Sequence, residues 1–509
     1  MNESLPDAGE KQQTNEVSYK YILKFTGIFS SVQGLNLFVS IVRNKLAAVI
    51  LGPAGMALVA IYNSITTFIA DLSNLGIKFS WVRNLSELYS ENDKEKISEY
   101  IKLIRTWSLW IAIGGALLCA FLSPLISLYS FGGDWSHAGD ICLLSPMIIF
   151  LAITSGEISI LKGMRILKRV AAISGLSAVV ALISTIPFFY FLGYDGIIPA
   201  LNVSTFLVLC IHLFYSVSLY PWKVSLFSKA CFQRGKNMVK LGIPYTLASL
   251  AGSIVTLSIP AYLLSRGSLE DVGYFKAGYG LIVTYAGMIF VAMEADYFPR
   301  LSSIQHDIQK MNRVINQQVE VCLLLISPSL VGFMLLMPVF VPLLYSGVFL
   351  PVVDMALCAG FYLFFRALLL PVSYIPLAKG DSITYLITEI FYDVIVLLLI
   401  IVLFSWFGLE GTGIALSLSI ILEIIFVTLV YSRKYGFRYD VEILKMGIFQ
   451  LIILIATFCI CYWGTFLLKI IVGGLLLIIS SALSINRLQK KTALFSGIVN
   501  KISKTIKHK

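Results

Sequence analysis

Long apolar runs separated by short polar segments occupy most of the chain. Each run has about 20 residues, the length that an α-helix needs to cross a bilayer core of about 30 Å. Fourteen such runs are present, at residues 25–50, 55–78, 106–130, 141–161, 170–192, 197–220, 242–264, 273–297, 320–345, 352–376, 383–406, 411–432, 446–467 and 470–486. The pattern predicts an all-α polytopic membrane protein with about 14 transmembrane helices.

A second pattern is internal repetition at an offset of 215 to 217 residues. FLGYDGIIPALNVS, residues 191–204, aligns with WFGLEGTGIALSLS, residues 406–419. Shorter matches near the same offset pair residues 160–163 with 377–380 and 25–28 with 240–243. The repeated unit contains six helices, and an even number of spans returns the chain to the same side. The copies are therefore parallel, which predicts two six-helix lobes with ligand binding between them.

This organisation divides most of the chain into six segments. The segments are a cytoplasmic N-terminal tail (1–24), an N-lobe (25–220), a basic cytoplasmic linker (221–241), a C-lobe (242–432), two further helices (446–486) and a basic amphipathic tail (487–509). Residues 91–105 also form an amphipathic pattern, with Ile97, Tyr100, Ile101 and Ile104 on one helical face. We expect this stretch and the C-terminal tail to lie on the membrane surface.

Composition supports a membrane protein and sets its orientation. The chain is 58% hydrophobic and 13% charged, against about 25% charged residues in soluble domains, and its mean hydropathy is +0.86. Cytoplasmic loops carry the excess of Lys and Arg. With a cytoplasmic N-terminus, 33 of the 39 Lys and Arg residues fall on the cytoplasmic side. Both termini are then cytoplasmic, and the net charge of +11 requires no nucleic acid.

No catalytic or metal-binding pattern is evident. The four histidines are scattered, and the eight cysteines lack the spacing of metal ligands or redox motifs. The sequence also lacks a metalloprotease helix motif, a nucleophile elbow and a phosphate-binding loop. We therefore predict a carrier without cofactors rather than an enzyme.

One segment resembles a known transporter family. Residues 43–65 read RNKLAAVILGPAGMALVAIYNSI, and Lys45, the turn at 51–55 and the following 56–58 resemble the junction between the first two helices of O-antigen and enterobacterial-common-antigen translocases. The resemblance continues to residue 85 and into DVGYFKAGYGL, residues 271–281. The chain is similar to Wzx-type flippases of the multidrug/oligosaccharidyl-lipid/polysaccharide (MOP) superfamily. Fourteen spans depart from the twelve usually described for these flippases.

The resemblance implies a location and an activity. A Wzx-type flippase is a multi-pass protein of the bacterial inner membrane that moves undecaprenyl-diphosphate-linked oligosaccharide, such as an O-antigen repeat unit, from the cytoplasmic to the periplasmic leaflet. It implies alternating access, with H⁺ or Na⁺ as the coupling ion, and polymerase or chain-length proteins of the pathway as partners. The sequence leaves the identity of the glycan open.

Charged residues within or beside the predicted spans are the candidate site residues, because a charge at mid-bilayer costs about 2.5–3.5 kcal/mol on insertion scales. Arg366 is deepest, about a dozen residues from either helix end. The candidate substrate-binding cations are Arg366, Lys45, Arg43, Arg266 and Lys276. The candidate ion-coupling or charge-balancing acids are Asp71, Glu294, Asp296, Glu389, Asp393 and Glu423. Arg366 either binds the diphosphate or balances the acids.

Two other functions fit parts of this pattern. A MATE-like antiporter would share the two-lobed helical design, but an exporter of organic cations needs an acidic cavity. A membrane glycan polymerase or ligase of the same pathway would need room for sugar chemistry in a large far-side loop, and every far-side loop here is short.

The charge distribution predicts the topology. Reporter fusions after Lys168, Lys236 and Lys509 should give cytoplasmic signals, and fusions near Asp134 and Glu410 should give far-side signals. A far-side signal at Lys509 would remove one of the two C-terminal helices from this topology.

Overall fold

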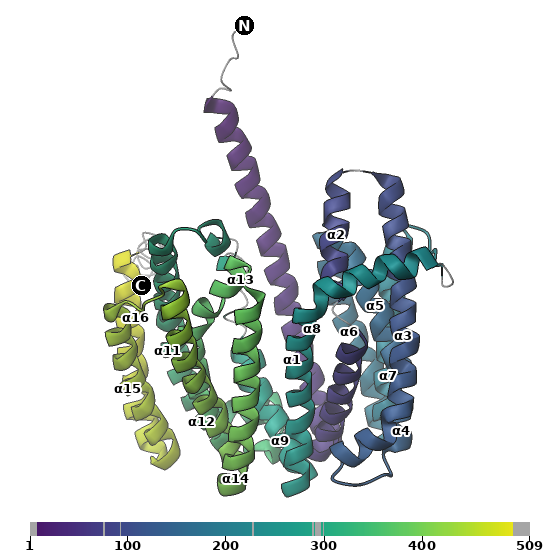
Figure 1. Cartoon of the computed structure of the whole chain (residues 1–509). Coiled ribbons are helices and arrows are strands. Elements are labelled where there is room, and N and C mark those ends of the chain that lie inside the picture. The colour runs from purple at the N-terminus through teal and green to yellow at the C-terminus, as the bar shows by residue number, and fades with distance from the viewer. Residues whose placement is uncertain are drawn as a thin grey trace, which may run out of the picture. The chain divides into compact units, whose positions relative to one another are not determined.

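The computed structural model describes the chain from the first long helix to the last (Figure 1). The described residues are 8–74, 77–91, 93–225, 229–287, 290, 297–298 and 300–491. Every regular element in these ranges is a helix, which confirms the all-α fold. The predicted amphipathic tail lies outside the described residues from position 492 onward.

The described residues contain the following helices. In chain order they are α1 (Ala8–Asn74), α2 (Ile77–Glu91), α3 (Lys94–Ser130), α4 (Ala138–Cys142), α5 (Ser145–Gly163), α6 (Leu167–Leu192), α7 (Ile197–Val217), α8 (Lys229–Arg266), α9 (Leu269–Tyr279), the π-helix η1 (Gly280–Ala286), α11 (Ile308–Leu344), the 3₁₀ turn η2 (Gly347–Phe349), α12 (Val352–Ser373), α13 (Ile375–Lys379), α14 (Ser382–Tyr435), α15 (Val441–Trp463) and α16 (Phe466–Lys491).

Two of the long helices each hold a pair of predicted spans. α1 is interrupted at Gly52, where φ is 67°, and α14 is interrupted at Gly408, where φ is 57°. Glycine adopts these positive φ values without the steric cost that a side chain would bring. In the described residues 11 helices are long and apolar enough to cross a membrane, counting each interrupted helix once. The polytopic helical fold is therefore confirmed.

The chain forms two compact units. Unit 1 contains residues 1–50, 65–126 and 136–246, and unit 2 contains residues 51–64, 127–135 and 247–509. In unit 1, α7 packs against α5 and α6. In unit 2, α12 packs against α11 and α14, and the C-terminal helices α15 and α16 lie along α11 (Figure 1). The predicted boundaries of the two lobes stay a prediction.

The two turns of the longest sequence match share a backbone conformation. Gly193 has φ 57° and ψ −127°, and Gly408 has φ 57° and ψ −138°. Three residues further on, a Cβ atom at Gly196 or Gly411 would lie 2.2 or 2.1 Å from a backbone oxygen. Each turn therefore requires glycine at both positions, which explains the local match. The repeat of whole lobes stays a prediction.

The amphipathic stretch at 91–105 was predicted to lie on the membrane surface, but its apolar face packs inside the protein. α3 begins at Lys94, after Asp93 accepts hydrogen bonds from the backbone of Glu95 and Lys96 at 3.1 Å each, and it runs without interruption to Ser130. Its apolar face is buried in the protein, with Ile97, Ile101 and Ile104 at most 2% exposed in one core with Trp81 and Leu85. The pattern was amphipathic because α2 and α5 cover one face of α3.

A buried ion pair joins three elements of unit 1. Arg105 on α3 donates from Nε to Glu157 Oε1 on α5 at 2.9 Å and from Nη2 to Oε2 at 3.2 Å, and both side chains are 1% exposed. The remaining donors reach Ser216 Oγ at 3.2 Å and the backbone oxygens of Tyr220 and Pro221 at 3.1 and 2.8 Å. The guanidinium thus attaches the segment after α7 to α3 and α5.

Removing either partner of this pair leaves a buried charge without its counter-charge, which costs about 3–5 kcal/mol. We expect Arg105→Met and Glu157→Leu each to lower the thermal midpoint of the purified protein strongly. The double variant should unfold at a higher temperature than either single variant, because it leaves no unpaired charge.

The exposed pair Arg83–Glu87, whose side chains are 58% and 63% exposed, is the control. Its variants should change stability by about 1 kcal/mol or less. Additive losses in the Arg105/Glu157 double variant would contradict the assigned role.

Candidate functional site

Arg366 lies in the interior of α12, away from both helix ends. In its most apolar stretch α12 has 78% of its residues buried, a larger share than any other candidate span in the described residues. Arg366 itself is partly exposed. Within the described part of the chain it has no hydrogen bond and no ion pair within 4.0 Å. A guanidinium with five donors is thus held in a buried helix, and none of the described residues is bonded to it.

Two carboxyl groups lie near Arg366 at longer range, and a third lies near those two. Glu389 and Glu423 lie within electrostatic range of the guanidinium, and Asp393 lies within range of both acids. Glu389 and Asp393 share a face on the first half of α14, and Glu423 is on the second half. We call Arg366, Glu389, Asp393 and Glu423 the Arg366 cluster. The structure brings together these four candidates from two helices.

The acids of this cluster are not fully bonded. Glu423 is 6% exposed, and its Oε2 atom has no hydrogen-bond partner within the described residues. A side chain at Gly252 of α8 would place its Cβ 3.6 Å from Asp393 Oδ2, so α8 passes close to that carboxylate. A buried oxygen without a partner costs about 1–3 kcal/mol. This cost marks Glu423 as a group that another species, such as a bound ion, can satisfy.

Tyrosines line the same region, and the sequence reading did not single them out. Tyr362 precedes Arg366 by one helical turn on α12, Tyr392 is on α14 and Tyr279 ends α9, and all three lie within electrostatic range of Arg366 or of its acids. The sequence feature that could have identified them is a tyrosine within an apolar span. Their hydroxyl groups add hydrogen-bonding capacity to the site.

The candidates in unit 1 lie on α1. Arg43 is exposed and Lys45 partly exposed, and both take part in interactions within the structure, as does Asp71. The carboxylate of Asp71 attracts the ammonium group of Lys78 at the start of α2. Asp71 is therefore positioned against a cation of its own unit.

The remaining cations belong to unit 2. Lys276 is an exposed residue on α9, within the segment at 271–281 that carries part of the family resemblance. That segment meets the turn after Gly52, because a Cβ at Gly273 would lie 2.0 Å from the backbone oxygen of Pro53. Only glycine permits this approach. Glu294 and Asp296 lie outside the described residues.

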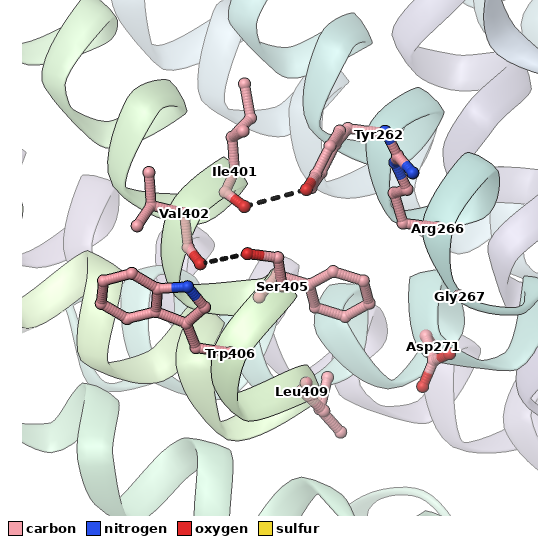
Figure 2. Close-up of a pocket in the computed structure, with 11 residues that line it drawn as sticks. Tyr262, Arg266, Gly267, Asp271, Ile401, Val402, Ser405, Trp406 and Leu409 are labelled. Atoms are coloured by element: carbon pink, nitrogen blue, oxygen red, sulfur yellow. Dashed lines mark hydrogen bonds between the residues drawn. The ribbon is translucent and has the colours of Figure 1, made fainter.

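Arg266 lines a pocket of about 920 Å³ between the end of α8 and the turn in α14 (Figure 2). The lining residues are Tyr262, Arg266, Gly267, Asp271, Ile401, Val402, Phe404, Ser405, Trp406, Gly408 and Leu409. Arg266 is exposed and has no hydrogen bond or ion pair within the described residues. The pocket combines this cation with aromatic and hydroxyl groups.

Comparisons with known proteins agree with this architecture. A model of the polysaccharide biosynthesis protein family matches residues 22–305, more than half of the chain. No curated protein sequence matches the chain. The search of solved structures matches the lipid II flippase MurJ in an inward closed conformation, with a TM-score of 0.67, 18% identity and coverage of 90% of this chain and 99% of MurJ.

Multidrug resistance MATE transporters of the MOP superfamily also match. The match to the inward-facing structure has a TM-score of 0.66 and 16% identity, and it covers 80% of this chain and 98% of the MATE transporter. The outward-facing structure has a TM-score of 0.57 and 15% identity, with coverage of 81% and 96%. At these identities the likeness shows the fold alone. The chain therefore belongs to the polysaccharide biosynthesis protein family and has the helical fold of MOP-superfamily transporters.

Proposed function

We propose that this protein is a flippase of the bacterial inner membrane that moves undecaprenyl-diphosphate-linked oligosaccharide from the cytoplasmic to the periplasmic leaflet. The observation that carries the proposal is Arg366, a partly exposed guanidinium inside a buried span without a bonded partner in the described residues. Arg is suited to this task because its planar fork binds phosphate oxygens at two points. Membership of the polysaccharide biosynthesis family supports a glycan-linked substrate.

The chemistry of such a substrate fits a carrier better than a channel. Its diphosphate and sugars oppose passage through hydrocarbon, whereas its lipid tail can stay in the bilayer throughout. A site with a cation for the diphosphate, presented alternately to each leaflet, moves only the head group. Lys45, Arg43, Arg266 and Lys276 are the further cations proposed along this route. The pathway's polymerase and chain-length proteins are the proposed partners.

The acids of the Arg366 cluster supply a means of coupling. Glu389, Asp393 and Glu423 outnumber the single guanidinium, and Glu423 holds an oxygen without a partner within the described residues. Binding of H⁺ or Na⁺ would lower their attraction for Arg366 and free it for phosphate. Release of the ion would restore that attraction and expel the substrate. In this cycle Arg366 binds the substrate and the three acids bind the coupling ion.

Substitution of Arg366 tests the proposal. Arg366→Ala should lower glycan export about 10–100-fold, the loss expected for hydrogen bonds to a charged group, while the protein still inserts. Arg366→Lys should also fail, because Lys keeps the charge but not the two-point geometry. Cell-surface glycan measured at equal membrane abundance is the readout.

Arg433→Ala is the matched control, because Arg433 is an exposed residue at the end of α14. Export should be unchanged in this variant. Full export by Arg366→Lys, or rescue of Arg366→Ala by joint neutralisation of Glu389 and Asp393, would show that Arg366 only balances charge. Full export by Arg366→Ala would contradict the proposal.

A MATE-like antiporter is the second candidate, and the excess of acids in the Arg366 cluster favours it. Three carboxyl groups beside one guanidinium can attract an organic cation. Export of ethidium from loaded vesicles measures this activity. Ethidium efflux that is lost on joint neutralisation of Glu389, Asp393 and Glu423, with no effect on surface glycan, would replace the flippase by an antiporter.

A further inference from the structure

The pocket around Arg266 has features that differ from those of the Arg366 cluster. It lies at the end of α8 and at the Gly408 turn of α14, which the charge distribution predicts on the far side of the membrane (Figure 2). Its volume of about 920 Å³ is at the upper end of small-ligand sites, which span about 300–1,000 Å³. A head group larger than a single phosphate therefore fits.

The hydroxyl groups in this pocket are oriented by the backbone. Tyr262 donates its hydroxyl hydrogen to the backbone oxygen of Ile401 at 2.9 Å, and Ser405 donates to that of Val402 at 2.7 Å (Figure 2). With both hydrogens already used, the two oxygens can only accept hydrogen bonds from a ligand. They therefore suit a donor, such as a sugar hydroxyl, and not a phosphate oxygen.

Arg266 and Trp406 bring chemistry that complements these two hydroxyl groups. Arg266 offers donors without a partner in the described residues, which suit phosphate oxygens. Trp406 is 71% exposed and offers an aromatic face for the C–H surface of a sugar ring. The one carboxylate, Asp271, accepts hydrogen bonds from the backbone nitrogen and hydroxyl of Ser268 at 2.8 Å each, where it caps α9.

The fold alone does not require this polarity. The positions 215 residues earlier, which the sequence repeat pairs with Tyr262, Arg266 and Gly267, are Ala47, Leu51 and Gly52. The glycine is kept, since a side chain at Gly267 would lie 2.9 Å from the Phe404 ring. The hydroxyl and the guanidinium are present only in the second copy.

We propose that this pocket binds the phosphate-linked sugar head of the lipid-linked glycan on the far side of the membrane, as a second site separate from the Arg366 cluster. Arg266 binds phosphate, Trp406 stacks on a sugar ring, and the Tyr262 and Ser405 oxygens accept hydrogen bonds from sugar hydroxyls. The inference rests on the proposed function for the identity of the lipid. It assigns the pocket to the outgoing product.

Native mass spectrometry of the full chain in nanodiscs tests the proposal, because it counts bound ligands. The probes are a disaccharide linked to geranyl diphosphate, geranyl diphosphate without sugar, and phosphatidylglycerol. Wild-type protein should carry two molecules of the sugar-bearing probe and Arg366→Ala one, and Arg366→Ala with Trp406→Ala should bind that one molecule more weakly. In the Arg366→Ala background, Arg266→Gln should weaken both diphosphate probes about tenfold. Trp406→Ala should weaken only the sugar-bearing probe, also about tenfold.

Two exposed residues outside the pocket provide matched controls. Trp463 at the end of α15 is 72% exposed, and Arg433 is exposed at the other end of the second half of α14. Trp463→Ala and Arg433→Gln should bind as wild type. The proposal is overturned if Trp406→Ala and Arg266→Gln bind the sugar-bearing probe normally. It is also overturned if Trp406→Ala releases phosphatidylglycerol equally, which would make the pocket a general lipid contact.

The two proposals fail in different ways. Loss of one bound probe in Trp406→Ala, with normal glycan export by Arg366→Ala, would support the pocket and contradict the proposed role of Arg366. Loss of all probe binding in Arg366→Ala alone would overturn the second site and leave the flippase standing.

Discussion

A charge removed from water must be satisfied by protein, ion or ligand, and this requirement distinguishes Arg105, which is buried, from Arg366, which is partly exposed within a buried helix. Arg105 is satisfied completely, by a two-point ion pair with Glu157 and by backbone oxygens of the segment that follows. Arg366 has only acids at longer range and no bonded partner in the described residues. The first arrangement stabilises a fixed contact, and the second leaves a guanidinium ready to bind. Arg105 therefore has a structural role, and the proposed role of Arg366 is in transport.

The same requirement shapes the backbone. Inside a bilayer a chain can reverse only where its peptide groups stay bonded or reach the interface, so tight turns at helix ends are needed. The turns at Gly52 and Gly408 meet this need with positive φ values that let one helix follow another almost directly. The turn at Gly408 also forms one wall of the Arg266 pocket. The glycine turn in the backbone thus also shapes the proposed second site.

The helical fold was predictable because the hydrocarbon core of a membrane requires apolar helices of about 20 residues, which a hydropathy pattern identifies. Arg366 was identified because it is a charged residue within one of these apolar runs. Other features depend on partners distant in sequence. The face of Ile97, Ile101 and Ile104 has the pattern of a membrane-surface helix, and only the packing of α2 and α5 shows that protein covers it. The pair of Arg105 and Glu157, 52 positions apart, carries no local signal beyond a glutamate in an apolar run. The Arg266 pocket likewise forms where the end of α8 lies beside the Gly408 turn, and the sequence alone does not predict that these two segments are close.

The central claim is that this chain by itself moves a lipid-linked glycan between leaflets. The direct measurement reconstitutes the purified protein into liposomes that carry the lipid-linked oligosaccharide in both leaflets and adds a membrane-impermeant glycosidase. We expect the glycosidase to reach nearly all of the glycan when the protein is present and only the outer-leaflet share in protein-free liposomes. Protection of the inner-leaflet glycan in liposomes that contain folded protein, with the coupling ion supplied, would contradict flipping by this chain.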